Sequence, residues 1–231
     1  MNLLSDRILN FYSHLHYDGI LPDGIKIMNP FVENEDIRDI CSSFYKKFYD
    51  DNNPRTLILG INPGRLGAGA TGIPFTDTKR LNEDCAIPYS GFVSHEPSSV
   101  FIYEMIQQFG GPQAFYSMFY INSVCPLGFT FEKESGKSIN YNYYDDVLLE
   151  SAVKDFIIRN IQTQIELTGS NEVCFCLGTG KNYTFLSKLN TIHHFFEKII
   201  PLEHPRFIMQ YKSKSKQWYI DDYLRKLTLE K

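Results

Sequence analysis

Short apolar runs alternate with longer amphipathic stretches along this chain, and the alternation predicts strands separated by helices. The runs are too short for helices and lack the polar alternation of half-exposed strands, so they are typical of buried strands. Strands are expected at 56–61 (TLILGI), 118–124 (MFYINSV), 172–177 (EVCFCL) and 198–202. Residues 19–30 are rich in turn formers, and a long glycine-rich loop is expected over 62–97.

The amphipathic stretches place apolar residues at three- and four-residue spacing, as a helix with one buried face requires. They predict helices over 1–17, 33–50, 98–109, 144–167, 182–189 and 214–227, and Gly169 is placed to end the fourth of these. Strands that alternate with helices form a mainly parallel sheet covered on both faces. We therefore predict an α/β fold with three layers, α/β/α, around a short, mainly parallel central sheet.

Residues 1–231 are expected to form a single domain, with 1–50 as a helical extension packed on it. In such folds ligands bind beyond the carboxyl ends of the strands. That rule directs attention to the segments that begin at Asn62, at Asn122 and at His204.

Composition narrows the function classes. A formal net charge of −4 excludes a protein that coats nucleic acid through bulk positive charge, but it allows a local basic strip that contacts a few phosphates. Aromatic residues are abundant, with 18 Phe and 15 Tyr. Such rings usually pack in cores, and they also form stacking surfaces for nucleic-acid bases.

The cysteines and histidines predict no metal site. The five cysteines are odd in number and lack Cys-x-x-Cys spacing, and Cys174 and Cys176 lie in an apolar run. Reduced core residues of an intracellular, cytoplasmic protein are expected, not disulfides, zinc or an iron–sulfur cluster. His14 and His16 point to different faces of a predicted helix. Because no apolar run approaches the ~20 residues that span a bilayer, no membrane contact is expected.

Two glycine-rich segments have the letters of nucleotide-binding loops without their context. Residues 67–72 fit GxGxxG, but they do not directly follow a strand and no helix is predicted to start there. Residues 178–181 (GTGK) resemble the end of a phosphate loop, yet Phe175 and Asn182 stand where that pattern needs Gly and Ser or Thr. No nucleotide cofactor is expected.

Three segments that follow predicted strands resemble the motifs of one enzyme family. Residues 60–75, GINPGRLGAGATGIPF, align without a gap to a motif of the single-strand-selective monofunctional uracil-DNA glycosylases, GMNPGPFGMAQTGVPF. This SMUG-like family is part of the uracil-DNA glycosylase superfamily. Residues 122–127 (NSVCPL) resemble its base-recognition segment, N-x-C-P-L, and 204–206 (HPR) resemble its second active-site motif, which begins H-P-S-P-R.

The chain departs from the family at specific positions. The Asn122 segment has one extra residue before Cys-Pro-Leu, and the His204 motif lacks the Ser-Pro insertion. Arg65 and Leu66 replace Pro and Phe. These differences leave open which residue wedges the DNA and which bases are accepted.

The resemblance implies two catalytic residues. Asn62 matches the residue that positions the attacking water, and its amide can orient a water but cannot act as a general base. His204 matches the donor of a hydrogen bond to uracil O2, where negative charge develops. As isolated residues, Asn62 would be a turn former before Pro63 and His204 a structural histidine.

The resemblance also implies a set of substrate-binding residues. Phe75 matches the ring that stacks on the flipped base, with a core ring as the alternative. Asn122 matches the residue that donates to uracil O4 and accepts from N3–H, with a strand-end cap as the alternative. Glycines let the backbone approach the base closely. The remaining expected contacts are Gly60, Ile61, Pro63, Gly64, Gly67 and Gly72.

The segment 204–216 (HPRFIMQYKSKSK) is basic and contains no acid. Expected DNA contacts are Arg206, Phe207, Lys212, Lys214 and Lys216. They would combine phosphate binding with an apolar wedge that keeps the base extruded. The alternative is a solvated helix start.

The function that follows from the resemblance is hydrolytic removal of uracil, or a related deaminated base, from single- or double-stranded DNA in base-excision repair. We expect a monomer without metal, cofactor or lyase step, associated with the nucleoid when it acts on DNA. Two alternatives stay open. One is a glycosylase that prefers hypoxanthine or another damaged base, and the other is a non-catalytic module that binds DNA or a nucleotide.

Overall fold

Four parallel strands form the centre of the computed structural model, which describes residues 2–33 and 35–229. They are β2 (Thr56–Gly60), β3 (Phe119–Ser123), β6 (Val173–Leu177) and β7 (Lys198–Leu202), in the order β3-β2-β6-β7. Each pairing in this sheet is parallel, so the carboxyl ends of all four strands lie at one edge. The predicted parallel sheet is confirmed.

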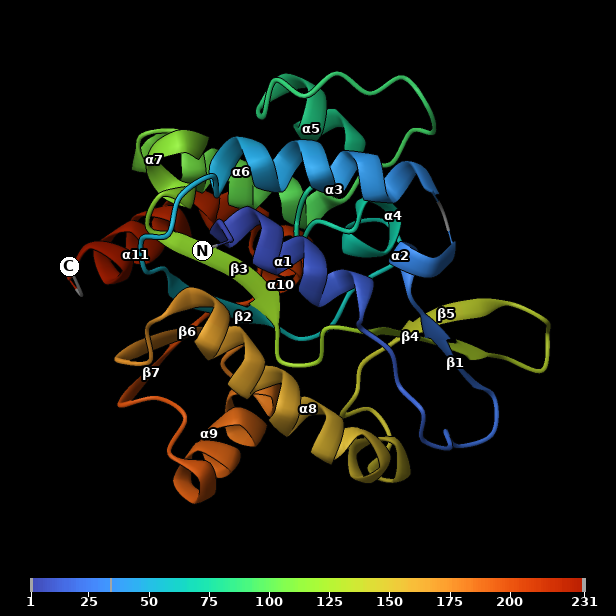
Figure 1. The fold of residues 1–231 in the computed structure, drawn as a ribbon. Helices are drawn as coiled ribbons and strands as arrows, with labels where there is room; N and C mark the ends of the chain where they lie inside the picture. Colours follow the sequence, from blue (N-terminus) through green and yellow to red (C-terminus); the bar gives the residue numbers. More distant parts are fainter. Residues whose placement is uncertain (1, 34, 230–231) are drawn as a thin grey trace.

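Helices flank both faces of this sheet (Figure 1). Helix α6 (Pro97–Phe109) lies in the connection from β2 to β3, and α8 (Val147–Thr168) connects β3 to β6 in the opposite direction across the sheet. Since parallel crossovers are right-handed, the two connections lie on opposite faces. Helix α9 (Lys181–His193) continues on the α8 side, whereas α10 (Pro205–Tyr211) and α11 (Lys216–Leu229) pack against α6.

The ends of α8 follow the capping rules. Asp146 accepts hydrogen bonds from the amides of Leu148 (2.7 Å) and Leu149 (3.0 Å), and Gly169 ends the helix with a φ of 68°. The remaining helical elements are α1 (Leu4–Ser13), α2 (Pro30–Glu33), α3 (Glu35–Phe48), α4 (Ala68–Thr71), α5 (Thr78–Glu83), α7 (Pro112–Tyr116) and the 3₁₀ turn η1 (Ser213–Ser215). Met1 and Asn34, which fall within predicted helices, lie outside the described residues. No helix in the described ranges has the length and apolar content to cross a membrane.

A second sheet was not predicted from the sequence. It is antiparallel and consists of β1 (Ile25–Met28), β4 (Gly128–Glu132) and β5 (Ser138–Tyr141), in the order β1-β4-β5. These strands are four or five residues long, and β4 and β5 are only partly buried. Without a long apolar run, they give no strand signal, and β1 lies inside the segment that its turn formers marked as irregular.

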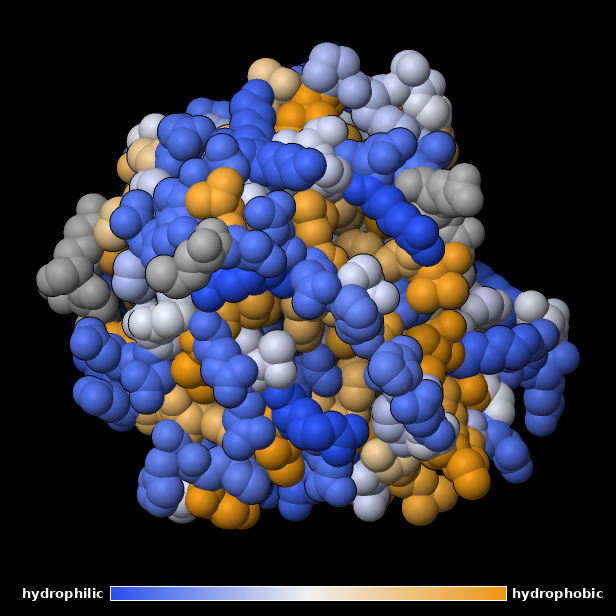
Figure 2. All heavy atoms as spheres, viewed as in Figure 1, coloured by the Kyte–Doolittle hydropathy of each residue, from blue (hydrophilic) through white to orange (hydrophobic). Residues whose placement is uncertain are grey.

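Aromatic side chains join the N-terminal helices to the parallel sheet. Tyr49 stacks edge-on against Tyr120 with ring centroids 5.8 Å apart, and its hydroxyl donates to the carbonyl of Phe119 (3.0 Å). Tyr45 packs on Tyr49 in the same cluster. The face drawn in Figure 2 is covered mainly by hydrophilic residues with smaller hydrophobic patches. Most of the abundant aromatic side chains are buried in the core.

Gly72 contributes to packing and not to a ligand site. It ends α4 with a φ of 74°, in the left-handed region that favours glycine. A Cβ there would lie 2.6 Å from Cys41 Sγ, 2.8 Å from the Ile37 side chain and 2.9 Å from the Phe31 ring. The structure thus corrects the expected role of Gly72 in substrate binding, because its Cα faces α2 and α3.

We expect Gly72→Ala to lower the free energy of unfolding by about 2–4 kcal/mol. About 1 kcal/mol reflects the left-handed backbone, and about 1–3 kcal/mol the overpacking against α2 and α3. The matched control is Gly136→Ala, since Gly136 has the same φ of 74° but no atom within 4 Å of an added Cβ. Urea unfolding measures both, and equal losses would show that packing at Gly72 is not tight.

Candidate active site

A pocket of about 360 Å³ opens at the carboxyl edge of the parallel sheet. Its wall includes residues that follow β2, the last residue of β3 and residues that follow β7, as expected for an α/β sheet. Many of the residues predicted from the sequence meet there. Those that line the pocket are Ile61, Asn62, Pro63, Gly64, Phe75, His204, Arg206 and Phe207.

The Asn62 side chain is held on both sides by the backbone at the end of β5. Its Nδ2 donates to the carbonyl of Tyr141 (3.2 Å), and its Oδ1 accepts from the amide of Tyr143 (3.1 Å). These two bonds determine which way the amide faces. Because a carbonyl oxygen has two lone pairs, Oδ1 can accept one further hydrogen bond from a water in the pocket.

Phe75 lies over the end of β2 in a strained backbone conformation. Its φ of 53° is uncommon for a residue with a side chain and costs about 1–3 kcal/mol. Its ring would lie 3.4 Å from a Cβ on Gly60, so glycine there gives the ring its space. The centroid lies 6.0 Å from that of His204, with the planes at 56°. The Thr71 hydroxyl, which accepts from the amide of Ile73 (3.2 Å), braces the preceding turn.

His204 presents a neutral imidazole to the pocket. It is the N-cap of α10, and its Nδ1 accepts a hydrogen bond from the backbone amide of Arg206 (3.1 Å). An accepting Nδ1 carries no proton, so in the neutral ring the proton is on Nε2, which is then a donor. Burial, followed by the charge of Arg206, lowers the pKa of His204 to about 4. The ring is therefore uncharged at neutral pH.

The end of β3 presents Ser123, and not Asn122, to the pocket. Asn122 is 2% exposed; its Nδ2 donates to the hydroxyl of Tyr120 (3.0 Å), and its Oδ1 accepts from the amide of Ser123 (2.9 Å). This is the strand-end role, so the structure corrects the base-reading role expected of Asn122. A gapless comparison of 123–127 with N-x-C-P-L would have identified Ser123, which stands at the family's Asn position.

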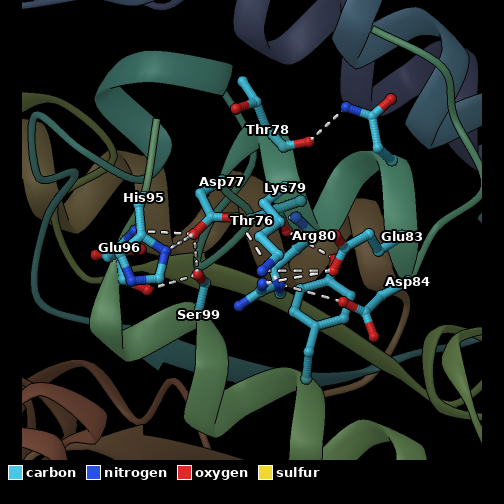
Figure 3. Close-up of polar contacts among 12 residues, drawn as sticks. Thr76, Asp77, Thr78, Lys79, Arg80, Glu83, Asp84, His95, Glu96 and Ser99 are labelled. Carbon is cyan, nitrogen blue, oxygen red and sulfur yellow. Dashed lines mark hydrogen bonds and ion pairs between the residues drawn. The ribbon is translucent and has the colours of Figure 1, made fainter. Parts of the chain in front are cut away.

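A buried aspartate holds the segment that carries Glu96 (Figure 3). The side chain of Asp77 accepts hydrogen bonds from the backbone amides of Arg80 (2.8 Å) and Glu96 (2.8 Å) and from the hydroxyl of Ser99 (2.7 Å). The side chains of Glu96 and Ser98 line the pocket. Sequence reasoning missed this segment, because a single glutamate before a proline has no distinctive pattern.

Glu96 lies against Gly67, and its charge state is perturbed. A Cβ on Gly67 would come within 2.2 Å of Glu96 Oε2, so this glycine makes room for the carboxyl group. The Oε2 atom is shielded from solvent and has no hydrogen-bond partner among the described residues. Burial and then the nearby Asp77 raise the pKa of Glu96 to about 7, and the charge of Arg206 opposes the shift.

The basic segment begins at the pocket and continues over the surface. Arg206 and Phe207 line the pocket with Gln210 and Tyr211, which were not predicted as site residues. Lys212 and Lys214 are exposed on the turn that follows α10.

Lys216, the last cation of the segment, is already paired. Its Nζ lies 2.5 Å and 2.7 Å from the two carboxylate oxygens of Glu104 on α6. This ion pair would compete with a phosphate for Lys216, whose expected role as a DNA contact stays a prediction.

Strand β5 and the residues that follow it supply a further part of the wall. Asn140, Asn142 and Tyr144 line the pocket, and Arg65 is tied to this sheet by a hydrogen bond from its Nε to the side-chain oxygen of Asn140 (3.1 Å). Asn140, Asn142 and Tyr144 were not predicted as site residues, because the strands β4 and β5 gave no signal in the sequence.

The pocket offers polar chemistry. Within the described residues, no group of three or more His, Cys, Asp or Glu side chains is arranged to hold a metal ion. The five cysteines are free thiols in the core. None of the described pocket residues is a lysine, so these residues provide no amine for a Schiff base with a sugar.

Comparison with known proteins agrees with this geometry. The sequence profile of the Uracil DNA glycosylase superfamily matches residues 46–228. No curated protein sequence matches the chain. Among solved structures, the crystal structure of wild-type SMUG2 from Pedobacter heparinus is 58% identical and superposes with a TM-score of 0.97, over 99% of this chain and 98% of that one.

The profile match covers most of the chain, including the three pocket segments that follow β2, β3 and β7. The structural match extends over the N-terminal helices and the antiparallel sheet as well. The chain therefore belongs to the uracil DNA glycosylase superfamily, in which it is a SMUG-like DNA glycosylase.

Proposed function

We propose that this protein hydrolyses the N-glycosidic bond of uracil in DNA and has no lyase activity. One observation carries the proposal: an oriented amide (Asn62), a stacking ring (Phe75) and a neutral imidazole donor (His204) line one pocket. Hydrolysis of this bond needs a positioned water, a held base and a donor for the charge that develops on the base. The pocket has a candidate for each requirement.

The neutral His204 suits the leaving base. As the C1′–N1 bond breaks, its electron pair moves onto the uracil ring, and negative charge gathers on O2. A donor that is already oriented, as Nε2–H is through the Nδ1 contact to Arg206, stabilises this charge without reorganisation. Such a donor typically contributes about 3–4 kcal/mol, or a factor of about 10²–10³ in rate.

Asn62 suits the attacking water. A water that donates a hydrogen bond to Oδ1 would be directed toward C1′, where positive charge develops as the base leaves. The contacts to Tyr141 and Tyr143 keep the amide from rotating, so the water position would be defined before the substrate binds. The absence of lysine from the described pocket lining supports hydrolysis over a lyase reaction.

A base can enter this pocket only after it has left the DNA stack. Arg206 at the pocket, together with the exposed Lys212 and Lys214, could contact backbone phosphates. Phe207 is 38% exposed and Leu66 is 55% exposed, and both are apolar groups suited to fill the space that a flipped base leaves. We place this activity in base-excision repair inside the cell and expect a monomer to perform it.

The presence of Ser123 in the pocket supports hypoxanthine as a second substrate. A serine hydroxyl is shorter than an asparagine amide and can donate or accept, so it does not require one donor–acceptor order on the base edge. It can donate to uracil O4 and to hypoxanthine O6 alike. The extra room and the rotatable donor support a base range wider than uracil.

The direct test is excision from oligonucleotides that carry one uracil, hypoxanthine or cytosine. We expect alkali-dependent strand scission at uracil and hypoxanthine but not at cytosine, in single- and double-stranded forms. Scission without alkali would contradict a monofunctional enzyme. Binding without abasic sites would instead identify a non-catalytic module.

His204→Ala should lower the single-turnover rate of uracil excision by about 10²–10³ and leave DNA affinity nearly unchanged. Because the pKa of His204 is about 4, its neutral form dominates above that pH, and activity that depends on it should fall only as pH drops toward 4. Single-turnover rates at saturating enzyme from pH 4 to 8 measure this. A wild-type rate in the variant would remove His204 from the mechanism.

Ser123→Ala should lower uracil excision by about tenfold, the effect of one lost neutral hydrogen bond, and should change the uracil-to-hypoxanthine ratio. The matched control is Asn122→Ala. It should lower the free energy of unfolding by about 1–3 kcal/mol, since it leaves buried polar groups unpaired, and should keep the base ratio. Single-turnover excision and urea unfolding measure both effects. A ratio that changes only in Asn122→Ala would restore Asn122 as the base reader.

A further inference from the structure

Glu96 is the one acidic side chain among the described residues that line the pocket. The steps of the proposed hydrolysis do not use it. Its Oε2 atom is out of solvent without a hydrogen-bond partner in the described ranges, a costly arrangement for a carboxylate. The Asp77 carboxylate accepts a hydrogen bond from the backbone amide of Glu96 (2.8 Å), which fixes the backbone that carries this side chain at the pocket (Figure 3). A carboxyl group that lines the pocket with an unpartnered oxygen is a candidate to interact with a ligand.

The charged groups around Glu96 show which pocket residues interact with its carboxyl group. The positive charge of Arg206 acts on it from α10, and the negative charge of Asp77 acts on it from the start of α5. His204 lines the same pocket and is neutral near pH 7, and the exposed His95 lies 3.5 Å from Asp77. Arg65 belongs to the loop that carries Gly67. Glu96 is therefore coupled to the cation that is best placed to meet DNA.

A DNA phosphate at Arg206 would bring a full negative charge close to Glu96. Two anions in a partly desolvated site repel each other. Uptake of a proton removes the repulsion, and a neutral carboxyl group can also donate a hydrogen bond to a phosphate oxygen. Because burial and Asp77 already raise the pKa of Glu96 to about 7, this proton is taken up at little cost near neutral pH.

We propose that Glu96 is a proton-linked phosphate contact: DNA binds beside Arg206 with a proton taken up on the Glu96 carboxyl group. The inference rests on the proposed function, because it needs DNA as the ligand. It makes affinity for DNA rise as pH falls through the range in which free Glu96 titrates. No other step of excision is assigned to this residue.

The test measures the Kd of an oligonucleotide with one tetrahydrofuran abasic analogue, which cannot be cleaved, from pH 6 to 8.5. For the wild type, Kd should increase by up to about tenfold per pH unit above pH 7. Glu96→Gln, which mimics the neutral carboxyl group, should bind with little pH dependence and more tightly than the wild type at pH 8.5. Glu172→Gln, at the opposite end of β6, removes the same charge, and His95→Gln removes the neighbouring titratable group. Both controls should keep the wild-type slope.

Three results would overturn the inference while leaving the proposed function intact. They are an unchanged pH slope in Glu96→Gln, loss of the slope in His95→Gln, or weaker binding by Glu96→Gln at every pH. If Glu96→Gln folds poorly, proton uptake by the wild type is measured by calorimetry in buffers of different ionisation enthalpy. Close to one proton per DNA bound is expected at pH 8, and none would overturn the inference. No DNA binding at any pH would overturn the proposed function itself.

Discussion

The side-chain amide of Asn62 donates a hydrogen bond to the carbonyl of Tyr141 and accepts one from the backbone amide of Tyr143, and these two bonds join the parallel sheet to the antiparallel one. The connection continues inward, because the Tyr143 hydroxyl donates to the side-chain oxygen of Asn182 (2.8 Å). Asn182 in turn donates to the carbonyls of Gly60 (3.3 Å) and Leu177 (3.0 Å) at the ends of β2 and β6. The position of the Asn62 amide thus depends on both sheets. A shift of either would move the water that Asn62 is proposed to hold, and the buried network resists such a shift because each broken bond leaves an unpaired polar group.

The electrostatic character of the pocket follows from burial. Desolvation lowers the pKa of His204 and raises that of Glu96, and both shifts favour the uncharged form. Arg206 is then the one arginine or lysine among the described residues that line the pocket. A site of this kind stabilises a transition state mainly through oriented dipoles, since a charged imidazole or carboxylate is disfavoured. Because few side chains in the pocket carry a charge, a neutral base could enter without displacing tightly bound counter-ions.

Prediction from the sequence succeeded where one segment contains both a strand and the site residues that follow it. The apolar run before Asn62 and the glycine-rich motif after it predicted the end of β2, the amide and the Phe75 ring together, and His204 followed β7 in the same way. Prediction failed where the role of a residue depends on strand register or on contacts with residues distant in the sequence. Asn122 and Ser123 are adjacent on β3, where successive side chains face opposite sides, so an error of one residue exchanges a buried cap for a pocket residue. Glu96, Asn140 and Lys216 owe their roles to contacts with residues 19 to 112 positions away, which local pattern cannot show.

The pairing of β1 with β4 has a consequence for where the protein can be cut. The family profile begins at residue 46, yet β1 at Ile25–Met28 pairs with Gly128–Phe131 in the hairpin that holds Asn62. A fragment that starts at residue 46 would leave the edge of β4 without its partner strand and expose its amides and carbonyls to pairing with other chains. Residues that precede the profile match therefore complete the antiparallel sheet and cover the β4 edge, so a fragment that omits them would be expected to aggregate more readily than the whole chain.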